Sequence, residues 1–284
     1  MAPGGRPPGA DRGARGGGTP AARLTGRPAS FTGAGQAGSM WTVVCSLRLI
    51  EDRLPPGAGY DGPLPALARV IYVTAGSLDL IPGPVGLSPG TAWHGAGGPE
   101  ARAGAAGAHV LRFELFGQPP PTTSAGRLVL EHPLALARPR QGVRPADDRA
   151  RREGGGRDWL MRCDRVEFEP GGVALPHRHR GGGIRRLLAG RLQVTVGDGA
   201  PRAMHPGDAW FESGREPVLA VAAPDEATSF IRVSVLPAEI RGQSSIVYVD
   251  PADAGRSRPR RYTVHIDEPI DLPGGGARRA AASR

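Results

Sequence analysis

The sequence predicts an all-β protein made of two related units, each a small antiparallel sandwich or barrel. Glycine and proline account for 44 and 30 of the 284 residues, whereas aromatic residues make up 5%. This composition is typical of a turn-rich β fold and argues against a large helical bundle. Short apolar runs alternate with Gly/Pro turns, and the same series of motifs occurs twice along the chain. The length is sufficient for two small hydrophobic cores.

Residues 1–39 are predicted to form a disordered tail before the first unit. They consist mainly of Gly, Pro, Ala and Arg and have no periodic apolar pattern, so they cannot bury a core. They also lack the continuous apolar run of a signal peptide. The first strand-like run follows Met40 directly, so either Met1 or Met40 is the expected start of the protein. We expect a cytoplasmic location.

An internal repeat relates residues 40–135 to residues 158–240. Four matches occur in the same order, with offsets between 114 and 120 residues, which indicates a duplicated unit. Residues 136–157, rich in Arg, Pro and Gly, are predicted to be a linker between the two units. The matches pair Trp41 and Cys45 with Trp159 and Cys163, Gly76 with Gly190, Pro89-Gly90 with Pro206-Gly207, and Leu111-Arg112 with Ile231-Arg232.

Each unit is expected to contain short antiparallel strands separated by turns. Residues 241–284 are predicted to be a C-terminal β extension with a basic tail. Its two β-like runs, 246–249 and 262–266, should dock onto one of the barrels rather than form a third domain. The predicted strands of the second unit are 165–169, 174–179, 184–188, 191–196, 209–212, 218–222 and 228–235.

The net charge of +9 is typical of proteins that bind nucleic acid, but the distribution of the charge along the chain argues against that function. All 36 basic residues are arginine, and the chain has neither Lys nor Asn, which indicates a coding bias toward G and C as in bacteria of high GC content. Most of the excess charge lies in residues 1–39 and 274–284, without interleaved aromatic residues. No apolar run reaches 18 residues, so no transmembrane helix is expected. The expected partner is therefore a small molecule rather than nucleic acid or a membrane.

Two motifs in the second unit suggest a family. The run from Gly172 to His179, followed by a Gly-rich turn and the run from Leu187 to Val194, resembles the first motif of the cupin superfamily. The run from His205 to Glu212 resembles the start of its second motif. The similarity spans about residues 159–237 and, through the repeat, extends weakly to residues 41–116. It implies a bicupin, which is a chain with two jelly-roll barrels in tandem.

The resemblance also implies a metal centre in the second barrel. His177 and His179 alternate along a predicted strand, so both side chains face the same side. Glu212 would complete a two-His-one-carboxylate set, and an outward-facing Glu212 on a solvated strand face is the alternative. The expected cofactor is a divalent ion of Fe, Mn, Ni, Cu or Zn. The alternative for the His pair is a surface stretch with no ligand role.

Three departures from the family pattern count against this metal centre. The glutamate expected after the second His falls on Gly183 or Ile184. The second-motif histidine falls on Leu219. In the first unit, the positions of the His pair hold Pro63 and Pro65, which cannot act as side-chain ligands, so we expect the first barrel to bind no metal.

Several other residues are assigned structural roles. Arg185 and Arg186 are interpreted as ordinary surface charge, with recognition of an anionic substrate at the barrel mouth as the alternative. Trp210, like Trp93 in the first unit, is interpreted as a packing residue. We expect His205 to be exposed. The two cysteines are expected to be buried small hydrophobic residues, because two are too few for a disulfide framework or a four-ligand zinc site.

Two functions from different classes remain open. The first is a metal-dependent small-molecule oxygenase resembling a dioxygenase, with His177, His179 and Glu212 as ligands. The second is a non-catalytic module that binds or senses a small molecule with weak or no metal binding. Cupins often form homodimers, although two fused barrels supply similar packing within one chain.

Overall fold

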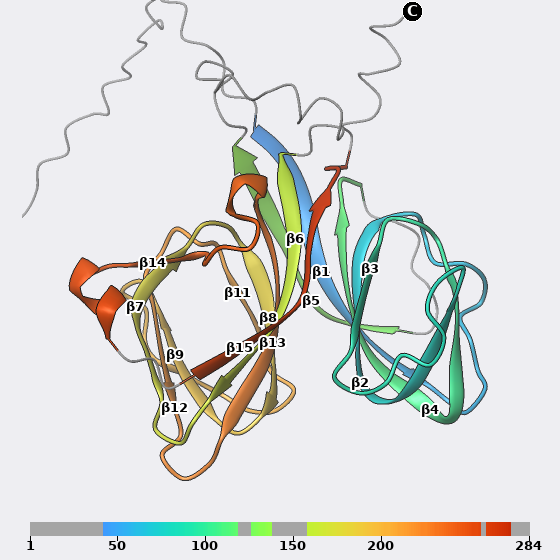
Figure 1. Ribbon diagram of the computed structural model, residues 1–284, viewed down its shortest axis with the longest axis horizontal. Coiled ribbons are helices and arrows are strands. Elements are labelled where there is room, and N and C mark those ends of the chain that lie inside the picture. Colours follow the sequence, from blue (N-terminus) through green and yellow to red (C-terminus); the bar gives the residue numbers. More distant parts are fainter. Residues whose placement is uncertain (1–41, 119–125, 138–157, 257–259, 274–284) are drawn as a thin grey trace, which may run out of the picture. The chain divides into compact units, whose positions relative to one another are not determined.

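The computed structural model describes residues 42–118, 126–137, 158–256 and 260–273 (Figure 1). These residues form β-strands and two short 3-10 helices, η1 (Ala238–Ile240) and η2 (Pro251–Gly255), which confirms the all-β prediction. No helix in the described part of the chain is long and apolar enough to cross a membrane. The predicted tail 1–39 and most of the predicted linker 136–157 lie outside the described residues.

The first barrel is one five-stranded antiparallel sheet with the order β3-β2-β4-β1-β5. Strands β2 and β4 pair from Ala68 opposite Leu115 to Ile81 opposite Glu100, with register shifts near Val73. Such irregularities bend a strand pair, which allows long strands to curve around a core. The strands are β1 (Thr42–Leu54), β2 (Ala68–Ile81), β3 (Ala92–Gly95), β4 (Glu100–Phe116) and β5 (Gly126–Ala137).

Inside the first barrel, an apolar cluster adjoins a buried network of charged side chains. Glu114 on β4 accepts hydrogen bonds from Arg48 on β1 and Arg69 on β2 at distances of 2.7–2.9 Å. Arg112 bonds both Glu114 and Asp52. The charges therefore have opposite-charge partners, as buried ions require.

The second barrel is a sandwich of two five-stranded sheets, with the orders β10-β9-β12-β7-β14 and β11-β8-β13-β6-β15. The strands predicted from sequence are all present, and the short β10 is an additional one. The strands are β6 (Trp159–Phe168), β7 (Val173–His179), β8 (Gly183–Ala189), β9 (Leu192–Val196), β10 (Arg202–Met204), β11 (Ala209–Glu212), β12 (Val218–Ala222), β13 (Thr228–Pro237), β14 (Ile246–Tyr248) and β15 (Arg260–Ile270).

The C-terminal extension completes both sheets of the second barrel, as predicted. Strand β14 pairs with β7 and places Tyr248 opposite His177. Strand β15 pairs with β6 along its length. In Figure 1 these two segments, in orange to dark red, lie against the second barrel rather than forming a separate domain. Each therefore covers a strand edge that would otherwise be open.

Alternation along β13 determines which side chains enter the second barrel. Ile231 and Val233 join a hydrophobic cluster shared with Leu47, Leu49 and other residues of the first barrel. Phe230 belongs instead to the cluster inside the second barrel. Arg232, two residues from Phe230, faces the same interior and lines its cavity.

The paired glycines of the repeat have a common structural cause. Gly76 and Gly190 have φ angles of +71° and +74°, a region that favours glycine. A Cβ at Gly190 would lie 2.5 Å from the carbonyl oxygen of Ala227, and a Cβ at Gly76 would lie 2.0 Å from that of Gly107. Both turns therefore require glycine for conformation and for space.

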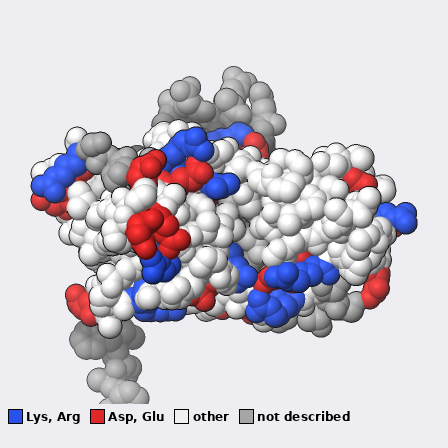
Figure 2. Space-filling model, turned by 90° about the horizontal axis from the view of Figure 1, so that it is seen from below, with Lys and Arg blue, Asp and Glu red and all other residues white. Residues whose placement is uncertain are grey.

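Charged side chains of both signs share the surface of the described residues. On the face drawn in Figure 2, basic and acidic groups lie beside one another and do not form a continuous basic surface. Cys45 and Cys163 are buried and free, as expected.

Candidate functional site

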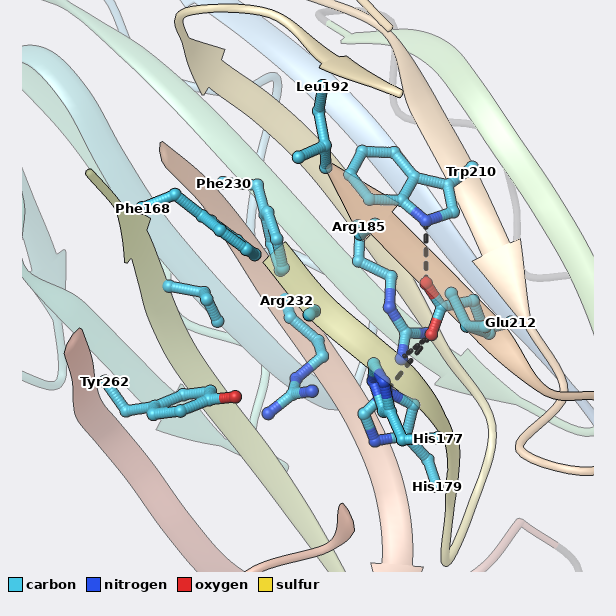
Figure 3. Close-up of a pocket in the computed structure, with 14 residues that line it drawn as sticks. Phe168, His177, His179, Arg185, Leu192, Trp210, Glu212, Phe230, Arg232 and Tyr262 are labelled. Carbon is cyan, nitrogen blue, oxygen red and sulfur yellow. Dashed lines mark hydrogen bonds and ion pairs between the residues drawn. The ribbon is translucent and has the colours of Figure 1, made fainter. Parts of the chain in front are cut away.

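The second barrel encloses a small cavity between its two sheets, of about 20 Å³ (Figure 3). One part of the lining is apolar and includes Phe168, Leu192 and Phe230. The other part is polar. Its members are His177, His179, Arg185, Glu212, Arg232 and Tyr262.

Glu212 lies at the centre of the polar part. Its Oε2 is 2.7 Å from Arg185 Nη2 and 3.2 Å from His179 Nε2. Its Oε1 accepts a hydrogen bond of 2.8 Å from Trp210 Nε1. Figure 3 shows these three side chains converging on the carboxylate. Glu212 thus faces inward together with Trp210, because alternate residues of β11 share a face.

Strand β8 explains why an arginine reaches Glu212. Arg185 pairs across the sheet with Trp210, and Gly183 pairs with Glu212. A Cβ at Gly183 would lie 2.4 Å from the carbonyl oxygen of Val233 and 2.8 Å from Ser234 Cα. The backbone therefore leaves no room for a glutamate at this position, and the side chain of Arg185 fills the space beside Glu212.

The two histidines project from β7 into the same cavity. Their ring centroids are 4.9 Å apart and the rings are nearly perpendicular. His177 Nδ1 donates a 2.7 Å hydrogen bond to the carbonyl oxygen of Leu175, which fixes its tautomer with the proton on Nδ1. Ser245, just before β14, lies 3.4 Å from His179 Nδ1.

Arg232 brings a second buried cation to the cavity. It forms a two-bond ion pair with Asp164 on β6, at 2.8 Å and 2.6 Å. Each of the two guanidinium groups that line the cavity is thus paired with a carboxylate, Arg185 with Glu212 and Arg232 with Asp164. The formal charges of these four groups cancel.

These contacts shift the pKa values of the site. Burial by itself would raise the pKa of Glu212, but Arg185 and then His179 hold it well below its usual range. Burial lowers the pKa of His179 to about 3, against the opposing effect of Glu212, and Arg232 and Arg185 lower it further. Burial also lowers the pKa of Arg185 to about 10. At neutral pH the site therefore contains a carboxylate, a guanidinium and a neutral His179.

A divalent metal does not fit this arrangement. His177, His179 and Glu212 do share one cavity, but Arg185 already lies against the carboxylate and would repel a second cation. His179 Nε2 lies 3.2 Å from the same carboxylate oxygen. Across the described residues, no group of three or more His, Cys, Asp or Glu side chains is disposed to hold a metal ion.

One sequence assignment is wrong. Arg185 and Arg186 are not surface charges: they are 1% and 7% exposed, and Arg186 contacts Glu51 of the first barrel at 2.8 Å. Leu219 does not line the cavity, whereas its neighbour Val218, which lies opposite His177, does. Arg185 lies two residues before Leu187, whose side chain is in the core of the second barrel. Because alternate residues of a strand share a face, this spacing could have placed Arg185 inside the barrel. His205 is exposed, as expected.

A larger pocket of about 400 Å³ lies outside the cavity, beside the edge strands β10 and β11. We call it the entrance pocket. Trp210 lines both the entrance pocket and the inner cavity. The lining of the entrance pocket comprises Val194, Val196, Gly199, Ala200, Arg202, Met204, Trp210 and Phe211.

Comparison with known proteins identifies the second barrel. Residues 164–233 match the family model described as the cupin domain. The second barrel is a cupin domain. No curated protein matches the sequence of the chain.

Solved structures resemble more of the chain than this domain. A tryptophan-to-tyrosine variant of the oxalate decarboxylase of Bacillus subtilis is 14% identical, with a TM-score of 0.51 over 75% of this chain and 73% of that chain. The oxalate decarboxylase formate complex of Lactobacillus farciminis is 15% identical, with a TM-score of 0.50 over 75% of this chain and 82% of that chain. The share of this chain that these structures match is larger than the cupin domain and its C-terminal extension together. The shared fold therefore includes the first barrel. At such identities the likeness concerns the fold alone.

Proposed function

We propose that the cupin domain binds a small organic molecule without a metal ion. The observation that carries this proposal is the contact of Arg185 with Glu212, at 2.7 Å, inside a cavity that two histidines also line. The guanidinium supplies the positive charge that a metal would otherwise bring to the carboxylate. The cupin fold supports a cupin-type function in general terms. Arg185 favours a ligand held by direct hydrogen bonds over one coordinated by a metal ion.

The polar atoms of the cavity leave hydrogen-bonding capacity for a ligand. Arg185 Nη2 and Glu212 Oε2 are buried and close together, but neither makes a hydrogen bond of good geometry with a described residue. Buried polar atoms normally find such a partner in the protein or in an ordered molecule. A ligand hydroxyl, amide or water can serve both atoms, because one donates and the other accepts.

A thermal-shift panel of small organic molecules tests this proposal. Compounds that stabilise the wild-type protein should lose that effect in Glu212→Gln, which keeps the shape but removes the charge. They should retain it in Glu216→Gln, because Glu216 is exposed and outside the cavity. Circular dichroism verifies that both variants fold. A panel without any stabilising compound, or stabilisation that Glu212→Gln leaves unchanged, contradicts the proposal.

A metal-dependent oxygenase is the second candidate function. It is favoured by the presence of all three predicted ligands, His177, His179 and Glu212, in one cavity. It requires the Arg185 side chain to leave Glu212 before an ion of Fe, Mn, Ni, Cu or Zn can bind. Stoichiometric metal in the wild-type protein would favour this candidate over metal-free binding.

A further inference from the structure

We infer that the entrance pocket binds an amphipathic organic anion, whose apolar body packs on Trp210 and whose anionic group pairs with Arg202. This inference rests on the proposed function, because it names the class of ligand that the cupin domain would take. It assigns recognition of the anionic group to Arg202, which lies outside both cupin-like motifs.

The pocket lies at an edge of the sandwich. Strand β10 is the edge of one sheet and β11 is the edge of the other. In the described structure, β10 pairs with β9 and β11 pairs with β8, so no ladder joins the two edges. The pocket therefore lies where, among the described residues, the two sheets of the sandwich are not joined by hydrogen bonds.

The two spaces differ in what they can hold. An inner cavity of about 20 Å³ has room for roughly one water molecule. The entrance pocket of about 400 Å³ lies within the usual size range of small-molecule sites. The body of an organic ligand therefore belongs in the entrance pocket, and only a small polar group fits farther in.

Trp210 lies between the entrance pocket and the inner cavity and forms a hydrogen bond with the carboxylate of the inner cavity. Its indole is 3% exposed and lines both of them. Its Nε1 donates to Glu212 Oε1 at 2.8 Å. A ligand that displaces the indole thus breaks a bond to the central carboxylate, so occupation of the pocket should alter the environment of Trp210.

The lining of the pocket specifies the ligand chemistry. Val194, Val196 and Met204 offer apolar and polarizable contacts, which favour an aromatic or aliphatic body. Arg202 is the one charged side chain of the lining and is exposed. Among the described residues, no carboxylate forms an ion pair with it, so its guanidinium can bind a carboxylate or sulfonate of the ligand.

Paired probes of one shape test the inference. We would titrate the full chain with 2-naphthoate and with the neutral 2-naphthamide, using calorimetry and tryptophan fluorescence. The expected result is at least tenfold tighter binding of naphthoate, with a change in tryptophan emission. Arg202→Gln should abolish this preference. Arg215→Gln should preserve it, because it removes an exposed arginine outside the pocket.

Three results would overturn the inference: neither probe binds, the wild-type protein binds both equally, or Arg202→Gln retains the preference for naphthoate. Each of these leaves the Glu212→Gln thermal-shift comparison unaffected. A negative result for the inference about the entrance pocket is therefore distinguishable from a negative result for the proposed function.

Discussion

Glu212 is central to the charge balance of the cavity, because three different side chains lie around its two oxygens. Arg185 and His179 approach Oε2, and Trp210 donates to Oε1. A buried carboxylate without such partners would take up a proton near neutral pH. Burial, with Arg232 and Arg185, lowers the pKa of His179 and keeps it neutral. Protonation of either residue therefore disturbs the whole group.

Acid should destabilise the protein through His179. Its pKa is about 3 in the folded state and near 6.5 when unfolded, so between these values the unfolded chain binds the additional proton. Stability is therefore full above pH 6.5 and falls as the pH decreases. The lowered pKa of Glu212 acts in the same direction below about pH 4.5. At pH 5, His179 alone accounts for a loss of about 2 kcal/mol.

Urea unfolding at pH 7 and pH 5 measures this effect. His179→Gln should reduce the difference between the two pH values. His205→Gln should leave the difference unchanged, because His205 is exposed. An equal pH dependence in the wild-type protein and in His179→Gln would contradict the assignment.

At the scale of the element, turns and strand pairing determine which residues reach the cavity. Gly183 lets β8 approach β13, and Gly190 ends the same strand in a left-handed conformation. The position of Arg185 opposite Trp210 depends on this pairing. A side chain added at a turn should therefore cost more stability where the surrounding atoms leave less space for it.

Gly190→Ala should destabilise the protein more than Gly242→Ala does. Both glycines have a φ angle near +70°, but a Cβ at Gly190 would meet the backbone, whereas nothing lies within 4 Å of a Cβ at Gly242. We expect a loss of about 1 kcal/mol for Gly242→Ala from conformation alone and at least twice that for Gly190→Ala. Denaturant titration of both variants checks this order, and equal losses would refute the role assigned to close packing.

The strands were predictable where apolar residues alternate between turns, as in β7, β11 and β12. Strand β10 was not predicted, because it has three residues, two of them exposed, and so shows no alternation of apolar residues. The sequence pattern placed His177 and His179 on one strand face. It left the orientation of Glu212 open, because alternation shows that Glu212 and Trp210 share a face but does not show whether that face points inward. Arg185 was misassigned because arginine is rarely buried, and its partner Glu212 is brought close only by sheet pairing.

At the scale of the whole chain, the two barrels share a hydrophobic cluster. Leu49 and Phe113 of the first barrel belong to the same cluster as Ile231 and Val233 of the second. Arg186 adds a buried ion pair with Glu51 across this boundary. The two barrels therefore stabilise each other even though only one contains the cavity.

We expect calorimetry to record one unfolding transition for both barrels. Val233→Asp, which buries an unpaired charge in the shared cluster, should lower the midpoint of that transition by roughly 10 °C. Val247→Asp is the matched control because Val247 is 46% exposed. Two separate transitions, of which Val233→Asp shifts only one, would show that the barrels unfold independently.

The metal content of the purified protein tests the central claim most directly. After loading with Fe, Mn, Ni, Cu or Zn and desalting, the wild-type chain should retain less than about a tenth of an equivalent, because Arg185 holds the carboxylate that a metal needs. Arg185→Met should retain more, since it releases Glu212 to join His177 and His179. About one equivalent of metal in the wild-type protein would contradict the account.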